Sequence, residues 1–481
     1  MRILLYNWAP AAGPVSEGGG VGVYLENLID ALAAGGHEVF VVSGGYRYAM
    51  LDSKPRFVRR RGTRPGARFY DLVNSPVVAP SYLMFPDATR VVECPELVAM
   101  FRGFLRRHGP FDVVHVQNVE GISFDILALR AEFPMTRFLL SNHNYGLVCQ
   151  QANLWRQDKE RCTSFQDGAR CHACDRFGPA TDGMMIDRFV RFHRLDRPGR
   201  LVRDTAWRLC RGVLKARRLL GARLPWDAPE ARRHQGRRIG PADAFRLRRE
   251  RALALVNANC SAVLSVSAAT EEILLAYGLD PQLSRVNYIG TRHYDPARTP
   301  PPKPSAGPLR LAFLGYTRPD KGFHFLVEAL EAMPERLEGC FSLMVAARNS
   351  DPAAVARLER LSDRLAGLTI RNGYRHDELP QLLAEVDLGL VLPLWDDALP
   401  QVAIEFVGYG VPILVTDRGG QQELAADPAF VFPAENVAEF WDRLERIWAK
   451  RSELERFWTL PRPLRTNAQH AAELLEIYAG A

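Results

Sequence analysis

The segment Leu392–Glu405, with the sequence LPLWDDALPQVAIE, joins a predicted strand end to a predicted helix. We expect the helix over residues 401–407. Its first turn begins near Pro400, so free backbone N–H groups point out of its start. Such a start attracts an anion by roughly 0.3–1 kcal/mol, and by up to about 2 kcal/mol when partly buried. The spacing predicts a diphosphate site at Leu399, Pro400 and Gln401.

Glu405 lies about a turn and a half further along the same predicted helix. Its carboxylate could accept two hydrogen bonds from a ribose diol, each contributing on the order of 1.5–3 kcal/mol. A lone acid on a helix is more often a solvated surface residue. Here the apolar neighbours on both sides and the following buried-looking strand at residues 412–416 favour a ligand-binding acid.

Two regions of the chain alternate short apolar runs with amphipathic stretches, which is typical of βα units and mostly parallel sheets. The first opens with a strand at residues 2–6, a glycine-rich loop, a helix at 24–34 and a strand at 38–42. A Pro-rich stretch cannot continue a helix or a central strand, and the alternation restarts after it at 309–314. The sequence predicts two α/β domains with a cleft between them, since such sheets bind ligands beyond their strand ends.

The composition is that of a folded globular protein, with 47% hydrophobic and 24% charged residues, which argues against a disordered chain. No apolar run approaches the roughly 20 residues that span a bilayer, and no secretory signal is recognisable. We therefore expect a cytoplasmic protein. Four scattered cysteines agree with a reducing compartment: Cys94, Cys210, Cys260 and Cys340.

The acidic segment resembles the signature of family 4 glycosyltransferases, which are retaining enzymes of the GT-B fold. In that family two acids separated by seven residues precede a Gly-x-Pro strand and a Gly-Gly-x-x-Glu turn. Asp397 and Glu405 have this separation, and GVP and GGQQE, ending at Glu423, follow. The resemblance implies that Asp397 contacts donor-sugar hydroxyls. Asp397 stands where the family usually has a glutamate, and its side chain is shorter by one C–C bond of about 1.5 Å. This difference leaves the donor sugar less well predicted than the nucleotide.

A second match, FLGYTRPDKGF at residues 313–323, resembles the strand that follows the linker in this family and its diphosphate-binding cations. The resemblance places Gly315, Arg318 and Lys321 beside the donor. Two cations there would neutralise the leaving nucleoside diphosphate. The family's arginine normally follows the glycine directly, where this chain has Tyr316. A loop of solvated charges is the alternative.

The N-terminal sequence EGGGVGVY at residues 17–24 resembles the family's glycine-rich loop beside the donor phosphates, through Gly19, Gly20 and Gly22. Glycine permits close backbone approach and positive φ. An NAD-binding fold also begins with a strand, glycines and a helix. The spacing does not fit G-x-G-x-x-G, however, and no ribose-binding acid ends the second strand, so a dehydrogenase is disfavoured.

Polar residues end two further predicted strands, DVVHVQN at 112–118 and SNHNY at 141–145. The family places a histidine at the position of His143, near the donor sugar and the acceptor. A neutral imidazole can donate to a sugar hydroxyl or to a backbone oxygen. We interpret His115 as a packing residue.

Four cysteines cluster in a loop rich in Arg, Asp and Gly, with the spacing C-x12-C-x8-C-x2-C. Four thiolates can close a tetrahedral zinc site, and the last pair has the spacing of a zinc knuckle. A second knuckle is lacking, so buried or free thiols are the alternative. The possible structural zinc ligands are Cys149, Cys162, Cys171 and Cys174.

Residues 187–251 contain 20 Lys and Arg against 7 Asp and Glu, whereas the whole chain has a net charge of only +7. An anionic partner such as a membrane surface is expected. Val202, Ala206, Leu209 and Val213 share one helical face with the basic residues largely off it, which suits an interfacial helix on anionic lipid. A core-packed helix with a solvated basic face is equally compatible. Few aromatic residues and no recognised module argue against nucleic acid.

We therefore predict a GT-B fold of two facing Rossmann-like domains. Residues 1–295 form the acceptor-side domain, with an insertion at about 150–255, and residues 296–308 the linker. Residues 309–464 bind the nucleotide-sugar, and residues 465–481 form a helix that crosses back.

The resemblance implies a retaining hexosyltransferase-like enzyme without a catalytic metal. It would move a sugar from a nucleotide-diphosphate sugar to a glycan, lipid-linked or small-molecule acceptor in polysaccharide or glycoconjugate biosynthesis, at the inner membrane face. A non-hydrolysing nucleotide-sugar epimerase and a binding protein without catalysis are the alternatives. Asp397 and Tyr316 suggest the latter.

Overall fold

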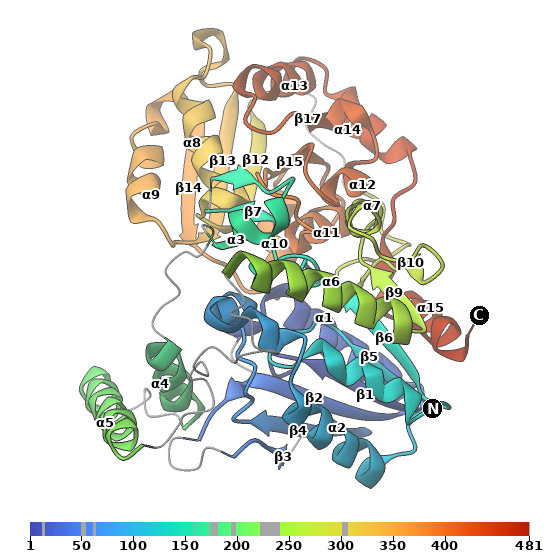
Figure 1. Cartoon of the computed structure of the whole chain (residues 1–481). Coiled ribbons are helices and arrows are strands. Elements are labelled where there is room, and N and C mark those ends of the chain that lie inside the picture. The colour runs from blue at the N-terminus through green and yellow to red at the C-terminus, as the bar shows by residue number, and fades with distance from the viewer. Residues whose placement is uncertain are drawn as a thin grey trace.

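A computed structural model describes residues 1–11, 15–49, 54–60, 64–157, 159–172, 174, 181–193, 199–221, 241–300 and 306–480. Two mainly parallel sheets, each with its own helices, form the lower (N-terminal) and upper (C-terminal) halves of Figure 1. The predicted α/β class and the two-sheet architecture are confirmed. The domain limits stay a prediction, and residues 301–305 of the Pro-rich linker lie outside the described residues.

The N-terminal half is built on an eight-stranded sheet in the order β10-β9-β6-β5-β1-β2-β4-β3. Every neighbouring pair is parallel except β3 with β4, the edge hairpin. The central strands are continuous apolar runs, as expected for a sheet covered on both faces. The strands are β1 Arg2–Asn7, β2 Glu38–Arg47, β3 Arg56–Arg60, β4 Ala67–Val73, β5 Val113–Val116, β6 Arg137–Asn142, β9 Ala262–Ser265 and β10 Ser284–Val286.

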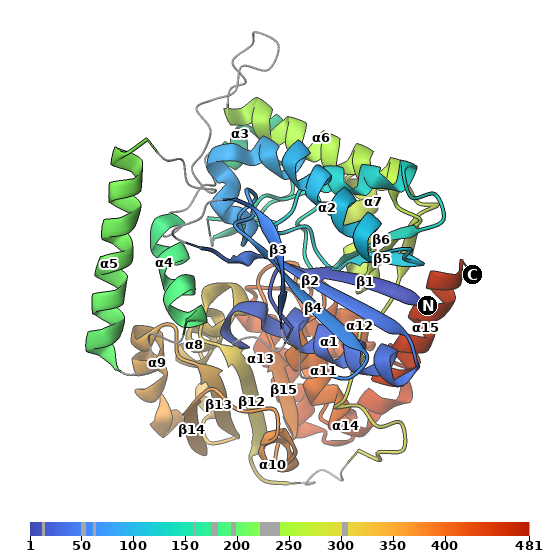
Figure 2. The ribbon, with the colours of Figure 1, turned by 90° about the horizontal axis from the view of Figure 1, so that it is seen from below.

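The helices of this half include those of the predicted insertion. They are α1 Val15–Ala34, α2 Pro95–His108, α3 Ala169–His172, α4 Thr181–Phe192, α5 Arg200–Leu219, α6 Pro241–Asn259 and α7 Ala268–Ala276. Helix α6 packs against the 3₁₀ helices Ser81–Val91 and Phe124–Ala131, so this part of the insertion is integrated into the core. Helix α5 stands at the edge of the molecule beside α4 (Figure 2).

The C-terminal half is built on a six-stranded, wholly parallel sheet in the order β14-β13-β12-β15-β16-β17. Its strands are β12 Leu309–Tyr316, β13 Phe341–Arg348, β14 Gly367–Asn372, β15 Leu388–Val391, β16 Ile413–Thr416 and β17 Val431–Phe432. Its helices are α8 Phe323–Glu331, α9 Pro352–Glu359, α10 Leu379–Ala384, α11 Gln401–Gly408, α12 Gln421–Ala425, α13 Val437–Ala449 and α14 Ser452–Arg456.

The last helix, α15 (Asn467–Ala479), returns to the N-terminal half, as the sequence predicted. It begins with a capping box at Thr466 and packs against α1. The Tyr24 hydroxyl lies 3.0 Å from Nε2 of His470, and the Tyr478 hydroxyl lies 2.6 Å from Nδ1 of His115. These buried hydrogen bonds fix the helix on the first sheet, and they make His115 part of the packing, as expected.

One local prediction is wrong. Residues 17–22 were expected to form a glycine-rich loop, but α1 begins at Val15 and includes these glycines in its first turns. The apolar face of the helix overrides the low helix propensity of glycine, since Leu25, Leu28 and Ile29 are buried in the core. No helix in the described part of the chain is long and apolar enough to cross a membrane.

Candidate donor site

Helix α11 starts directly after the loop that leaves β15. Pro400 is its N-cap residue, with an extended backbone, and no side chain caps the helix there. The Ala403 N–H donates to the Pro400 carbonyl at 3.0 Å, so the N–H groups of Gln401 and Val402 are the ones left for an anion. Leu399 is buried, and so are Ala403 and Ile404 in the first turns. The sequence prediction of a helix start anchored in the core at this point is confirmed.

Lys321 and Asp397 meet at this helix start. The Lys321 ammonium lies 2.5 Å from Oδ2 of Asp397, and it also lies 5.1 Å from the centre of the Trp395 ring. Asp397 is only 7% exposed, so this ion pair is largely removed from water. Two residues predicted separately, one for the diphosphate and one for the sugar, are therefore direct partners.

The backbone of Gly322 holds Lys321 against this segment. Gly322 has a φ of +77°, and a Cβ atom there would lie 1.8 Å from the carbonyl oxygen of Leu392. Only glycine fits such a close approach. Arg318 extends from the same turn, donates to Asp320 at 2.8 Å and has a half-exposed side chain. Arg318 can therefore turn towards an anion at low cost.

Glu405 is fully buried and has partners that sequence reasoning missed. The Tyr374 hydroxyl donates to its Oε2 at 2.5 Å, and Nδ1 of His376 lies 3.3 Å from its Oε1. His376 stacks on His293, and the ligand atoms of His293, His376 and Glu405 lie within 4.8 Å of one another. Burial lowers the pKa of His293 to about 4, so this imidazole is neutral at pH 7.

Tyr374 and His376 directly follow β14, in the sequence NGYRHD at residues 372–377. Polar residues at the carboxyl end of a parallel strand were the signal that could have found them. Because the Tyr374 hydroxyl already takes one acceptor position of Glu405, the carboxylate is a preoriented group, and about three lone-pair positions remain for a ligand.

Two glycines approach the first turn of α11 from opposite halves. A Cβ atom on Gly20 would lie 2.5 Å from Cγ of Gln401, and one on Gly315 would lie 3.7 Å from a methyl group of Val402. Gly315, next to the last residue of β12, has a φ of +116°. Gly22 has open space beside its Cα atom, and Gly19 lies in the first turns of α1. The predicted glycine-rich segment thus reaches the helix start through Gly20.

His143 follows β6 in the N-terminal half. Its Nε2 lies 3.0 Å from Oε1 of Gln117, and its ring lies 4.8 Å from the ring of Tyr24. Burial, reinforced by nearby His470, lowers the pKa of His143 to about 3, so the imidazole is neutral at pH 7. Because Nε2 donates its proton to the Gln117 oxygen, Nδ1 remains free to accept one hydrogen bond.

Several hydrogen bonds join the two halves beside this site. The Glu423 carboxylate accepts from the N–H groups of Ala268 and Ala269, at 3.0 and 2.9 Å, and so caps α7 from the other half. The Ser267 hydroxyl donates to the carbonyl oxygen of Ala398 at 2.5 Å. The predicted GGQQE turn therefore positions the segment around Asp397 against the N-terminal half.

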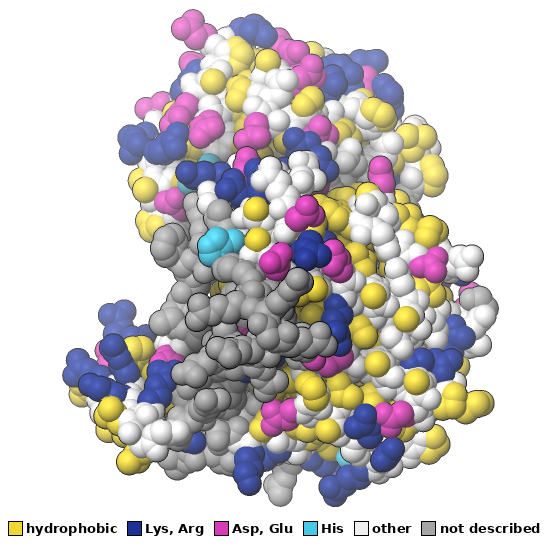
Figure 3. Space-filling view, viewed as in Figure 1, with side chains coloured by type: hydrophobic (Ala, Val, Ile, Leu, Met, Phe, Trp, Pro, Cys, Tyr) yellow, Lys and Arg dark blue, Asp and Glu magenta, His cyan; other side chains and the backbone are white. Residues whose placement is uncertain are grey.

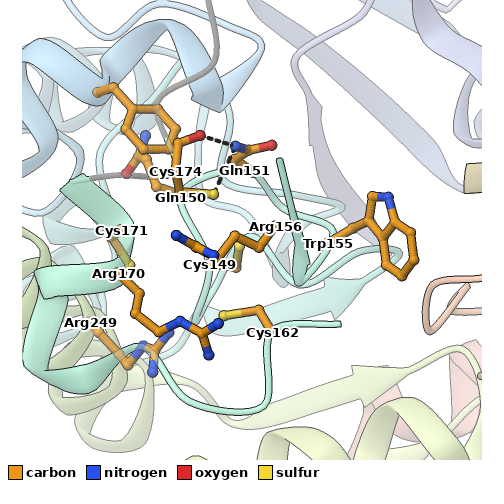
Figure 4. Close-up of a pocket in the computed structure, with 11 residues that line it drawn as sticks. Cys149, Gln150, Gln151, Trp155, Arg156, Cys162, Arg170, Cys171, Cys174 and Arg249 are labelled. Carbon is orange, nitrogen blue, oxygen red and sulfur yellow. Dashed lines mark hydrogen bonds between the residues drawn. The ribbon is translucent and has the colours of Figure 1, made fainter. Parts of the chain in front are cut away.

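The four clustered cysteines line one cavity in the N-terminal half (Figure 4). All four are half-buried, with free thiols. Burial raises the pKa of Cys171 to about 12 and that of Cys174 to about 11, and the neighbouring thiols add to both shifts. The predicted gathering of these cysteines is thus present in the fold.

Several solved structures resemble the whole chain. Sucrose-phosphate synthase from Thermosynechococcus elongatus is 16% identical, with a TM-score of 0.57 over 100% of this chain and 98% of that one. An α,α-trehalose-phosphate synthase (UDP-forming) from Burkholderia xenovorans, in complex with glucose-6-phosphate, is 12% identical, with a TM-score of 0.58 over 99% of each chain. HepE from Anabaena, in complex with UDP, is 13% identical, with a TM-score of 0.56 over 100% of each chain. At these identities the likeness concerns the fold.

Two family models match the sequence, one in each half. Residues 19–158 match a glycosyl transferase 4-like domain, and residues 308–450 match the glycosyl transferases group 1. No curated protein matches the chain significantly. The two matched segments together span more than half of the chain, and they contain the helix start of α11, the Lys321–Asp397 pair and His143. The chain belongs to the group 1 glycosyltransferases of family 4, and it is an enzyme of the GT-B fold that transfers sugars.

Proposed function

We propose that this glycosyltransferase uses a nucleotide-diphosphate sugar as donor and retains the configuration of the anomeric carbon. The observation that carries the proposal is the Lys321–Asp397 ion pair at the start of α11, with Glu405 in the same helix. Lys321 and the helix start suit the diphosphate of a nucleotide, and the buried acid Glu405 suits the ribose next to it. The protein groups therefore follow the same order as the parts of the nucleotide.

Donor binding exchanges the partner of Lys321. The diphosphate lies at the start of α11, where the N–H groups of the first turn and the cations Lys321 and Arg318 surround it. Lys321 turns from Asp397 to the phosphates and stabilises the charge that develops as the glycosidic bond breaks. Asp397 is then free to accept hydrogen bonds from the donor-sugar hydroxyls.

Glu405 holds the ribose through the acceptor positions that the Tyr374 hydroxyl leaves open. His143, whose Nε2 is held by Gln117, accepts a hydrogen bond through Nδ1 from a hydroxyl of the donor sugar or the acceptor. The family resemblance supports retention, with reaction on one face of the sugar and the leaving phosphate assisting deprotonation of the acceptor. We assign no protein nucleophile to this site.

The nucleotide is identified by a thermal-shift screen of UDP, GDP and ADP. A ligand at 100 times its dissociation constant stabilises the folded protein by about 2.7 kcal/mol. UDP is the first candidate, because it is bound in the HepE structure and is named for the trehalose-phosphate synthase.

Transfer from the matching nucleotide-sugar is then measured with the wild type and with Lys321→Ala and Glu405→Ala. We expect each substitution to reduce transfer at least about tenfold, since each removes a charged contact worth more than 1.4 kcal/mol. Full activity of both folded variants contradicts the site. Conversion of the donor without an acceptor supports an epimerase. Tight nucleotide binding without any transfer supports a binding protein.

We further propose that the acceptor is lipid-linked and that α5 places the enzyme on the anionic inner membrane face. One face of α5 buries Cys210 and Leu214, whereas the opposite face exposes apolar side chains: Leu201 is 82%, Leu209 66% and Leu219 79% exposed. Lys and Arg side chains gather with hydrophobic ones over this helix, at the lower left of Figure 3. An exposed apolar face flanked by basic residues suits an anionic lipid surface.

Co-sedimentation with vesicles tests this surface. We expect binding to phosphatidylglycerol vesicles, weak binding to phosphatidylcholine vesicles, and loss of binding in Leu209→Glu. Leu460→Glu, at an exposed leucine of the C-terminal half, is the matched control. Equal binding of both variants contradicts the role of α5.

A further inference from the structure

We propose that Cys149, Cys162, Cys171 and Cys174 bind one zinc ion as thiolates, and that this ion fixes the segment that holds Arg161 against Asp396. The zinc site stands independently of the donor site, whereas its effect on Asp396 rests on the proposed function.

The four thiols come from four places along the segment and meet around one cavity (Figure 4). Cys149 follows β6, and Cys162 follows the short strands β7 (Trp155–Arg156) and β8 (Glu160–Arg161). Cys171 lies in α3, and the Cys174 N–H donates to the Cys171 carbonyl at 3.0 Å in the turn after it. Each thiol is close enough to the other three to interact with them electrostatically.

Four thiolates are the full ligand set of a tetrahedral zinc ion. No three of these sulfur atoms lie within 4.8 Å of one another. Tetrahedral zinc with Zn–S bonds of about 2.3 Å requires S···S distances of about 3.8 Å, so zinc binding must draw the thiols inward.

Groups around the thiols suit a metal–thiolate centre. The Gln151 amide donates to Sγ of Cys174 at 3.0 Å and to its carbonyl oxygen at 2.7 Å. The guanidinium groups of Arg156, Arg170 and Arg249 also line the cavity. Zinc with four thiolates carries a charge of −2, and hydrogen bonds and cations of this kind orient and stabilise such a centre. Formation of the centre releases four thiol protons for each ion bound.

The backbone between the cysteines is strained in a way that a bound ion would offset. Among the described residues, five of the eight non-glycine residues with positive φ lie in this segment: Ala152, Leu154, Gln157, Gln166 and Asp167. Such conformations cost on the order of 1–3 kcal/mol each and persist where the surroundings impose them. Four metal–ligand bonds across this segment supply that constraint.

The segment also reaches the donor side. Strand β7 is drawn over the C-terminal half in Figure 1, and Nε of Arg161 in β8 lies 2.5 Å from Oδ2 of Asp396 in that half. Asp396 is buried and directly precedes Asp397. Arg161 is therefore a positioning residue for the donor-site loop, and Cys162 anchors its neighbouring backbone.

Metal analysis of the full-length protein, purified without chelator, tests the site. We expect about one zinc per chain, and X-ray absorption of the wild type should show sulfur ligands at about 2.3 Å. Zinc should be lost in Cys171→Ser/Cys174→Ser and kept in Cys340→Ser, whose thiol lies in the C-terminal half. A wild type without stoichiometric zinc, one that holds iron instead, or one whose zinc has nitrogen or oxygen ligands overturns the proposal. The wild-type spectrum decides even where the double variant does not fold.

The variant Arg161→Met tests the positioning of Asp396 by Arg161 separately from zinc binding. We expect the variant to keep its zinc and to show a donor KM raised about 3- to 10-fold, in line with loss of one charge-assisted hydrogen bond. An unchanged KM with zinc retained overturns the positioning role. A zinc-loaded wild type that transfers no sugar overturns the donor proposal and leaves the zinc site standing.

Discussion

Replacing Lys321 by methionine removes the cation at the start of α11 but keeps an apolar stem beside the Trp395 ring. A unit charge about 4 Å from another contributes about 4 kcal/mol at the effective dielectric constant of a protein surface. The Lys321 side chain is 32% exposed, so solvent screening reduces this to about 2 kcal/mol. We therefore expect kcat/KM for the donor to fall about 30-fold.

The same change leaves the buried Asp397 without its cation. We expect the free energy of unfolding of Lys321→Met to fall by about 1–3 kcal/mol, measured by denaturant titration. Lys450→Met is the matched control, because Lys450 is a far more exposed lysine paired with Glu453 in the same half. Its donor kinetics should equal those of the wild type.

One kinetic and one equilibrium measurement test this prediction. Initial rates over a range of donor concentrations give kcat and KM, and isothermal titration gives the affinity for the free nucleoside diphosphate. If Lys321→Met transfers sugar and binds the nucleotide as the wild type does, the exchange of Lys321 between Asp397 and the diphosphate is refuted.

Three further changes test other parts of the molecule. Tyr374→Phe removes the donor to Glu405, so the nucleotide affinity should fall about 3- to 10-fold by titration; wild-type affinity would contradict that role. Gly322→Ala places a Cβ atom 1.8 Å from a carbonyl oxygen at a φ of +77°, whereas Gly339→Ala has a φ of +71° and open space. Thermal unfolding should show the first variant much less stable and the second destabilised by only about 1 kcal/mol; equal losses would remove the steric argument. Burial lowers the pKa of His470 to about 4, so its neutral form stabilises the fold above about pH 6.5, and this contribution is lost as the pH falls from about 6.5 to about 4. At pH 5 the loss of this contribution should lower the free energy of unfolding by about 2 kcal/mol. His470→Gln should make the free energy of unfolding depend less on pH between about 6.5 and about 4; an unchanged pH dependence in this variant would exclude the role of His470.

The sheet architecture was predictable because it depends on local patterns. The strand predicted at residues 309–314 is β12, and the helix predicted at 401–407 is α11, within one or two residues at each end. A continuous apolar run followed by an amphipathic helix leaves few other folds for a chain of this length. The same regularity predicts where α11 starts, and hence where an anion is expected to bind.

The partners of the site residues were not predictable, because they are brought together by tertiary contacts. Tyr374 precedes Glu405 by 31 positions, and Arg161 precedes Asp396 by 235. No spacing rule links residues so far apart. The edge strand β3, with the sequence RFVRR, was missed for a different reason: a charged edge strand lacks the apolar run that marks a buried one.

The position of the nucleotide in crystals of the protein soaked with UDP, GDP or ADP tests the donor site most directly. We predict that the diphosphate lies within hydrogen-bonding distance of Lys321 and of the first N–H groups of α11, with the ribose hydroxyls on Glu405. A nucleotide bound elsewhere, or with its ribose away from Glu405, would contradict the proposed site.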